Sequence, residues 1–159
     1  CGALGSLADD HLSSNRHAIR DAGGIKVIAV AMQIHMAHVE LQRYACAALG
    51  VLAEDSGNRV ALREAGAIQT VVDSMQRHSA DVEMQRFGCW ALQNFADDPT
   101  DAPAIFEAGG IGMVVEGMQR HMGDVLVQVH GVGALRGFAN DQSSRDAIRE
   151  AGGIKAIVS

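Results

Sequence analysis

Four short stretches of nearly identical sequence decide the fold of this chain: AGGI at Ala22–Ile25, AGAI at Ala65–Ile68, AGGI at Ala108–Ile111 and AGGI at Ala151–Ile154. Each begins 43 residues after the one before it. A second block recurs at nearly the same step, as CGALGSLADD (1–10), CAALGVLAED (46–55), CWALQNFADD (89–98) and VGALRGFAND (132–141). A fixed period of this length predicts one supersecondary unit stacked several times, in which no unit buries its apolar face alone.

The pattern within one unit predicts three helices. A short helix follows an N-cap residue, and a glycine that takes positive φ ends it. A second helix carries an apolar face at i, i+3, i+4 and i+7, and a third, longer helix runs from Asp81 to Ala96 before Pro99 stops it. The predicted N-caps are Asn15, Asn58, Asp101 and Ser144, and the predicted bend glycines are Gly23, Gly66, Gly109 and Gly152.

The four bends and the third-helix sequence MQRFGCWALQNFA (84–96) resemble the armadillo repeat family, whose third helix reads VQxxALWALxNIA. HEAT repeats, the nearest rival, lack a short first helix closed by glycine. The resemblance implies an all-α, right-handed α-solenoid of three full units plus partial units at both ends. We expect a partial third helix over 1–10, full repeats over 15–55, 58–98 and 101–141, and a partial repeat over 144–159.

The charge and apolar content exclude several function classes. The sequence has 13 Lys and Arg against 19 Asp and Glu, a formal net charge of −6, so we expect no nucleic-acid partner, because phosphate binding needs a cationic surface. No apolar run is long enough to span a bilayer, and we expect no membrane partner.

The cysteines and histidines recur at fixed positions in the units. Cys1, Cys46 and Cys89 share one position, which Val132 also occupies, so we interpret it as a small core slot rather than a reactive thiol or metal site. Free thiols and the resemblance favour the cytoplasm or nucleus. His35, His78 and His121 end the second helices, where a cation favours the helix dipole. We predict no enzyme, metal or cofactor, since no catalytic or ligating motif occurs.

The resemblance implies that the third helices line the inner, concave wall of the solenoid. Family members that hold extended peptides carry a Trp and an Asn one turn apart there, and the Asn amide binds the peptide backbone while Trp faces form slots. The matching pair is Trp90 and Asn94. Other units have Ala47 with Val51 and Gly133 with Gly137, which argues against a long peptide ladder and a nuclear-import adaptor role. Packing is the alternative role of Trp90.

Cationic and aromatic residues lie beside this pair. Arg86 and Phe87 lie one turn before Trp90 on the third helix. Arg43 and Tyr44 are their equivalents in the preceding unit, and His130 is the equivalent of Phe87 in the following unit. We interpret them as a site for an acidic or aromatic segment, with arginines paired inside the chain as the alternative. The acidic residues that end the third helices predict either capping of the next helix or a ridge for a basic partner. The candidate partner-binding residues are Arg43, Tyr44, Ala47, Arg86, Phe87, Trp90, Asn94 and His130.

These patterns predict a non-catalytic protein–protein interaction scaffold that binds a peptide or partner segment on its concave surface. The alternative is a structural segment of a longer repeat array. Neither end of the sequence carries a polar cap, which predicts head-to-tail self-association through the exposed apolar ends.

Overall fold

A computed structural model describes residues 13–139 and 142–150, and these ranges contain helices and turns with no β-strand. Residues 13–21 are helical. The helices that follow are α2 (Gly24–Ile34), α3 (Val39–Ala53), η1 (Ser56–Asn58), α4 (Arg59–Glu64), α5 (Ala67–Arg77), α6 (Val82–Ala96), η2 (Pro99–Asp101), α7 (Ala102–Glu107), α8 (Gly110–Arg120), α9 (Val125–Phe138) and α10 (Gln142–Glu150). None of these helices is long and apolar enough to cross a membrane.

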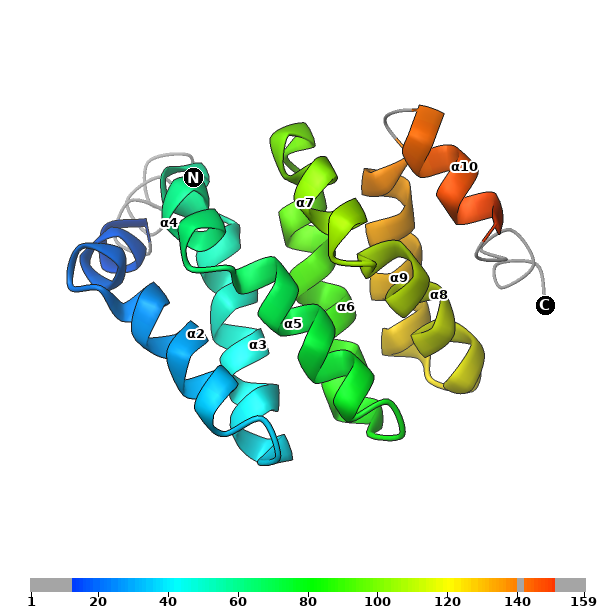
Figure 1. The fold of residues 1–159 in the computed structure, drawn as a ribbon, viewed down its shortest axis with the longest axis horizontal. Helices are drawn as coiled ribbons and strands as arrows, with labels where there is room; N and C mark the ends of the chain where they lie inside the picture. Colours follow the sequence, from blue (N-terminus) through cyan, green and yellow to red (C-terminus); the bar gives the residue numbers. More distant parts are fainter. Residues whose placement is uncertain (1–12, 140–141, 151–159) are drawn as a thin grey trace, which may run out of the picture.

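The helices repeat in the predicted order of a short, a medium and a long helix. The medium helices α2, α5 and α8 form one layer, and the long helices α3, α6 and α9 form a second layer behind them (Figure 1). Neighbouring helices of the long-helix layer pack against each other, α3 on α6 and α6 on α9. The prediction of an all-α helical repeat solenoid is confirmed. The expected partial third helix over 1–10 lies outside the described residues, and of the expected partial repeat over 144–159 only the residues up to Glu150, in α10, are described.

A left-handed glycine separates each short helix from the medium helix that follows. Gly23, Gly66 and Gly109 have φ values of 78°, 65° and 75°, and they are the N-caps of α2, α5 and α8. A residue with a Cβ disfavours this conformation, which explains why the sequence has glycine at each bend. The fourth predicted bend, at Gly152, lies outside the described residues.

The predicted N-caps of the short helices are wrong. Asn58 and Asp101 make no side-chain cap, because each is the last residue of a turn of 3₁₀-helix. Asn15 and Ser144 lie inside helical segments. The caps are one turn earlier: Asp55 accepts from the Gly57 amide and Asp98 from the Thr100 amide. The capping interpretation of the acidic ends of the third helices is therefore confirmed at these two residues.

Methionines and cysteines at recurring positions of the units are buried. Met32, Met75 and Met118 are at most 1% exposed, and Cys46 and Cys89 are fully buried free thiols. Burial raises the pKa of the Cys89 thiol to about 12, as expected for a thiolate that would lose its hydration. The core-slot interpretation is confirmed at Cys46 and Cys89, whereas Val132, at the same position of the third unit, is 42% exposed. Cys1 lies outside the described residues.

Polar side chains join the helices at the same positions in successive units. The Nε2 atom of His78 hydrogen-bonds the Met36 carbonyl, and that of His121 the Ser79 carbonyl, both at 2.8 Å. These histidines thus connect one unit to the one before it, besides lying at the helix ends where they were predicted. A glutamine amide of each long helix donates to two carbonyls at the end of the preceding medium helix; these residues are Gln42, Gln85 and Gln128.

In one of these glutamines, Gln85, the amide nitrogen is hydrogen-bonded but the amide oxygen is not. Gln42 Oε1 accepts a 2.8 Å hydrogen bond from Ser74 Oγ of the next unit. Gln85 Oε1 is buried with no partner among the described residues, and it faces Gly117, the equivalent of Ser74. A buried carbonyl oxygen without a donor costs stability.

We expect Gly117→Ser to be more stable than Gly117→Ala by about 1 kcal/mol, because both add a Cβ that comes within 2.9 Å of Gln85 Oε1 and only the serine hydroxyl donates to that oxygen. Gly117→Ala is the matched control, since alanine favours helix more than serine but has no donor. Urea unfolding of the three proteins tests this. Serine stabilising less than alanine would contradict the hydrogen bond.

Candidate functional site

A pocket opens between α6 and α9 in the long-helix layer. Its volume is about 180 Å³. The lining residues are Glu83, Arg86, Phe87 and Trp90 of α6 together with Leu126 and His130 of α9. The pocket therefore brings together four of the eight predicted partner-binding residues, namely Arg86, Phe87, Trp90 and His130. Sequence analysis missed Glu83 and Leu126, although both lie at helical spacing from predicted residues on the same helices.

Trp90 is held in place from both neighbouring helices. Its six-membered ring lies against Gly50 of α3, where an added Cβ would come within 3.1 Å of the ring. On the other side its ring centroid is 6.4 Å from that of His130. Trp90 stays partly exposed: it packs against α3, as the alternative interpretation predicts, and it also forms a wall of the pocket.

Asn94 lies one turn further along α6, but its amide group is used inside the protein. Its Nδ2 atom donates a 3.0 Å hydrogen bond to the Gly50 carbonyl, and the residue is only 7% exposed. One of the two Nδ2 hydrogens of Asn94 is thus used inside the protein. The contact to a peptide backbone that the resemblance implies for this amide stays a prediction.

Arg43 and Arg86 are paired within the chain, which is the alternative interpretation of these residues. Arg43 Nε donates to Asp81 at 2.9 Å, and Arg86 Nε donates to Asp124 at the same distance. Each aspartate also caps a long helix by accepting from the Met84 or the Val127 amide. The pKa of Asp81 and that of Asp124 are both lowered, mainly by the hydrogen bond from Arg43 and from Arg86, respectively. Both charges are thus balanced without a partner.

The remaining predicted residues lie on α3, away from the pocket. Tyr44 is 76% exposed, and Ala47, at the position equivalent to Trp90, is partly buried. Apolar side chains are also exposed on α9, where Leu126, Val129 and Val132 are 48%, 57% and 42% exposed. Of these three residues, Leu126 lines the pocket.

His130 is fixed by a residue that sequence analysis did not single out. Its Nδ1 atom lies 3.1 Å from Oε1 of Gln93 on α6. A Cβ at Gly133 would come within 3.0 Å of the Gln93 amide atoms, so the glycine leaves the room that this side chain occupies. Burial lowers the pKa of His130, which keeps the ring neutral at neutral pH.

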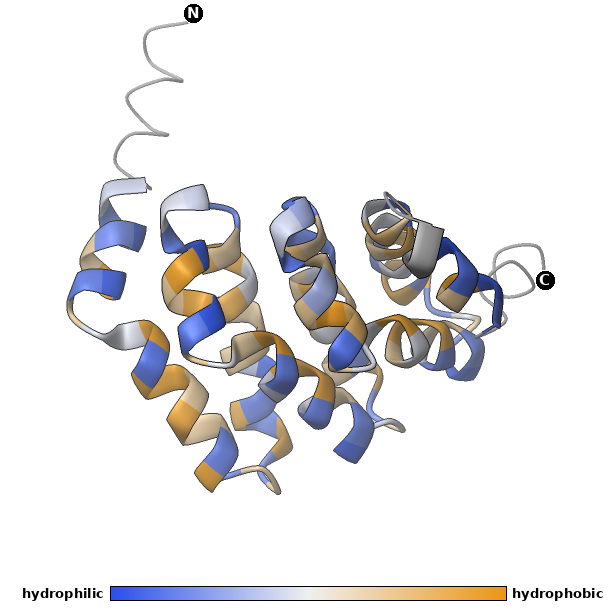
Figure 2. Ribbon diagram, turned by 45° about the horizontal axis from the view of Figure 1, so that its top comes forward, coloured by the Kyte–Doolittle hydropathy of each residue, from blue (hydrophilic) through white to orange (hydrophobic). Residues whose placement is uncertain are grey.

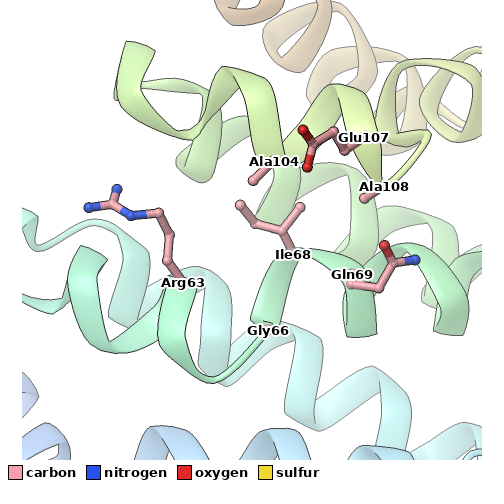
Figure 3. A pocket seen from close by; sticks show the side chains of 7 residues that line it. All are labelled: Arg63, Gly66, Ile68, Gln69, Ala104, Glu107 and Ala108. Carbon is pink, nitrogen blue, oxygen red and sulfur yellow. The ribbon is translucent and has the colours of Figure 1, made fainter.

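Two further pockets lie at the glycine bends and are equivalent to each other. One, of about 230 Å³, is lined by Arg63, Gly66, Ile68, Gln69, Ala104, Glu107 and Ala108 (Figure 3). The other, of about 210 Å³, is lined by the residues 43 positions earlier in each case. Arg63 pairs with Asp101 and donates to Thr100. Their recurrence indicates that the repeat geometry itself produces these pockets.

No group of three or more His, Cys, Asp or Glu side chains within residues 13–139 and 142–150 is arranged to hold a metal ion.

The comparisons with known proteins bear on the fold. No protein-family model and no curated protein matches the sequence. The chain is similar to an engineered protein whose crystal structure comes from the Northeast Structural Genomics Consortium, with a TM-score of 0.80 and 30% identity. The match covers 92% of this chain and 58% of the engineered protein, so this chain spans less than two thirds of its length. The similarity supports an all-helical repeat architecture.

Asp124→Asn is expected to lower the melting temperature at neutral pH, because asparagine keeps the N-cap acceptor but loses the ion pair with Arg86. A carboxyl whose pKa is lowered by folding stabilises the protein above its unfolded-state pKa, and this contribution disappears as the pH falls through the folded-state pKa. The difference from wild type should therefore shrink below about pH 4. Thermal unfolding across pH measures it.

Glu116→Gln is the matched control, because it removes an exposed pair with Arg120 on α8. Its effect at neutral pH should be smaller. An Asp124→Asn difference that stays constant down to low pH would contradict the ion-pair contribution.

Proposed function

We propose that this chain is part of an armadillo-type solenoid and serves as a non-catalytic protein–protein interaction scaffold. Its long-helix layer, the concave surface of that repeat type, would bind a segment of another protein. The observation that carries this proposal is the pocket between α6 and α9, in which Phe87, Trp90 and Leu126 present apolar surface to solvent. Buried free Cys46 and Cys89 support a reducing compartment, the cytoplasm or nucleus.

The pocket suits one apolar or aromatic side chain. Its volume of about 180 Å³ matches a leucine or phenylalanine rather than a longer stretch of chain. A partly buried tryptophan surrounded by other apolar side chains is typical of residues that dominate binding energy at protein interfaces. Leu126, at the wall of the pocket, and the exposed Val129 would contact the residues that flank this anchor.

Trp90→Ala should weaken binding about thirtyfold, since truncating a central aromatic residue of an interface costs about 2 kcal/mol. The probe is a peptide selected on the folded wild-type protein from a random display library, and its affinity is measured by fluorescence anisotropy. We expect the selected peptides to share an apolar or aromatic residue.

Val60→Ala is the matched control, because Val60 is 58% exposed on α4, outside the pocket. This variant should bind the peptide as wild type does. Peptides that bind Trp90→Ala as tightly as wild type, or a selection that yields no binder, would reject the proposal.

A second candidate function, a structural segment that associates end to end, is favoured by the surface of α2. Val27 and Ile34 are 67% and 70% exposed, and hydrophobic residues run along this helix (Figure 2). The positions equivalent to Val27 are Thr70 and Met113, which are 2% and 8% exposed because the preceding unit covers them. Val27 thus lies at a position that is a contact between units in the rest of the described chain.

If this surface mediates self-association, the mass measured by light scattering should rise with protein concentration. Val27→Lys should abolish the rise, because a charge would have to be buried in the contact. Val60→Lys is the control on α4. A constant monomer mass for wild type would contradict this candidate.

A further inference from the structure

The single tryptophan of the chain and a half-buried histidine form facing walls of the same pocket. Trp90 and His130 have ring centroids 6.4 Å apart, with the rings tilted by 50°. Both side chains line the pocket between α6 and α9. Any change in the charge of the imidazole therefore takes place next to the indole and inside the proposed binding pocket.

The hydrogen bond to Gln93 determines which ring nitrogen can titrate. Gln93 Oε1 can only accept, so the 3.1 Å contact places a proton on Nδ1 of His130. Gly133 leaves the space that the Gln93 amide occupies, since a side chain at position 133 would displace this amide. In the neutral ring, Nε2 carries the lone pair, and it is the atom that gains a proton when the pH falls.

We propose that His130 is a pH-responsive element of the Trp90 pocket: neutral His130 lets the pocket accept an uncharged apolar side chain of a partner, and protonation at Nε2 makes the pocket reject it. A partner side chain that fills the pocket removes water from the imidazole, which disfavours the charged ring further. The ring then loses its proton more readily in the complex, and by linkage the affinity falls as the pH falls.

The charged groups around His130 do not compensate its positive charge. Glu83 and Arg86 of α6 line the same pocket, and both are in ion pairs, Glu83 with Arg43 and Arg86 with Asp124 of α9. The charged residues of the other helices packed on α9 are Glu116 and Arg120 of α8, which pair with each other, and Arg145, Asp146, Arg149 and Glu150 of α10. The cause that lowers the pKa of the half-buried His130 ring is the loss of hydration on burial.

The first test needs no partner, so its outcome is independent of the proposed function. Trp90 is the only tryptophan in the sequence, and a protonated imidazole quenches indole fluorescence on contact. We expect the emission of the folded protein to fall on acidification from about pH 8 to about pH 5, with a single midpoint below the ordinary histidine value of about 6.5. Circular dichroism over the same range verifies that the fold persists.

Three variants identify the titrating group. His130→Gln should abolish the fluorescence change, whereas His38→Gln, on the exposed His38 that precedes α3, should leave it intact. Gln93→Glu should raise the midpoint by about one pH unit, because a carboxylate would stabilise the imidazolium. A flat profile, a change that survives His130→Gln, or a midpoint that Gln93→Glu leaves unmoved would overturn the proposal.

The second test concerns binding and rests on the proposed function. The affinity of the display-selected peptide should be about tenfold weaker at pH 5.5 than at pH 7.5 for wild type, and independent of pH for His130→Gln. If the fluorescence titration occurs but the affinity does not change with pH, the link between His130 and binding is wrong. If no peptide binds at any pH, the proposed function fails while the titration stands.

Discussion

The structure depends on one constraint: a unit of three helices cannot bury its own apolar side chains and has to bury them against the next unit. Val27, Thr70 and Met113 occupy the same position in successive units, yet only Val27, which has no described unit before it, is exposed. Burial at this position is therefore set by the neighbour rather than by the residue type. Regular stacking is the arrangement that buries the apolar side chains of every unit in the same way.

Stacking also explains why the polar residues at the unit boundaries act in pairs. Asp81 and Asp124 each begin a long helix and bind an arginine of the long helix before it, so a single carboxylate joins two units. His78 and His121 make a similar connection at the ends of the medium helices. Because Arg86 is balanced by Asp124 within the chain, the uncharged part of the neighbouring pocket lining consists of apolar side chains and His130.

The pocket arises because one position carries side chains of very different size in successive units. Trp90 stands where α3 has Ala47 and α9 has Gly133. The glycines on both sides create room, Gly50 for the indole of Trp90 and Gly133 for the amide of Gln93. This variation limits the site to one boundary between units, whereas a ladder of identical sites would require the same side chains in every unit.

The sequence alone determined the period, the order of helices, the glycine bends and the membership of Phe87, Trp90 and His130 in one surface, because these follow from local patterns that recur along the chain. Only the tertiary structure decided that Asp55 and Asp98 cap the short helices, that Asn94 bonds to Gly50, and that Gln93 holds His130. Repetition reveals which residues share a position. It does not reveal which partner from the next unit each polar side chain meets, since that partner is set by packing between units.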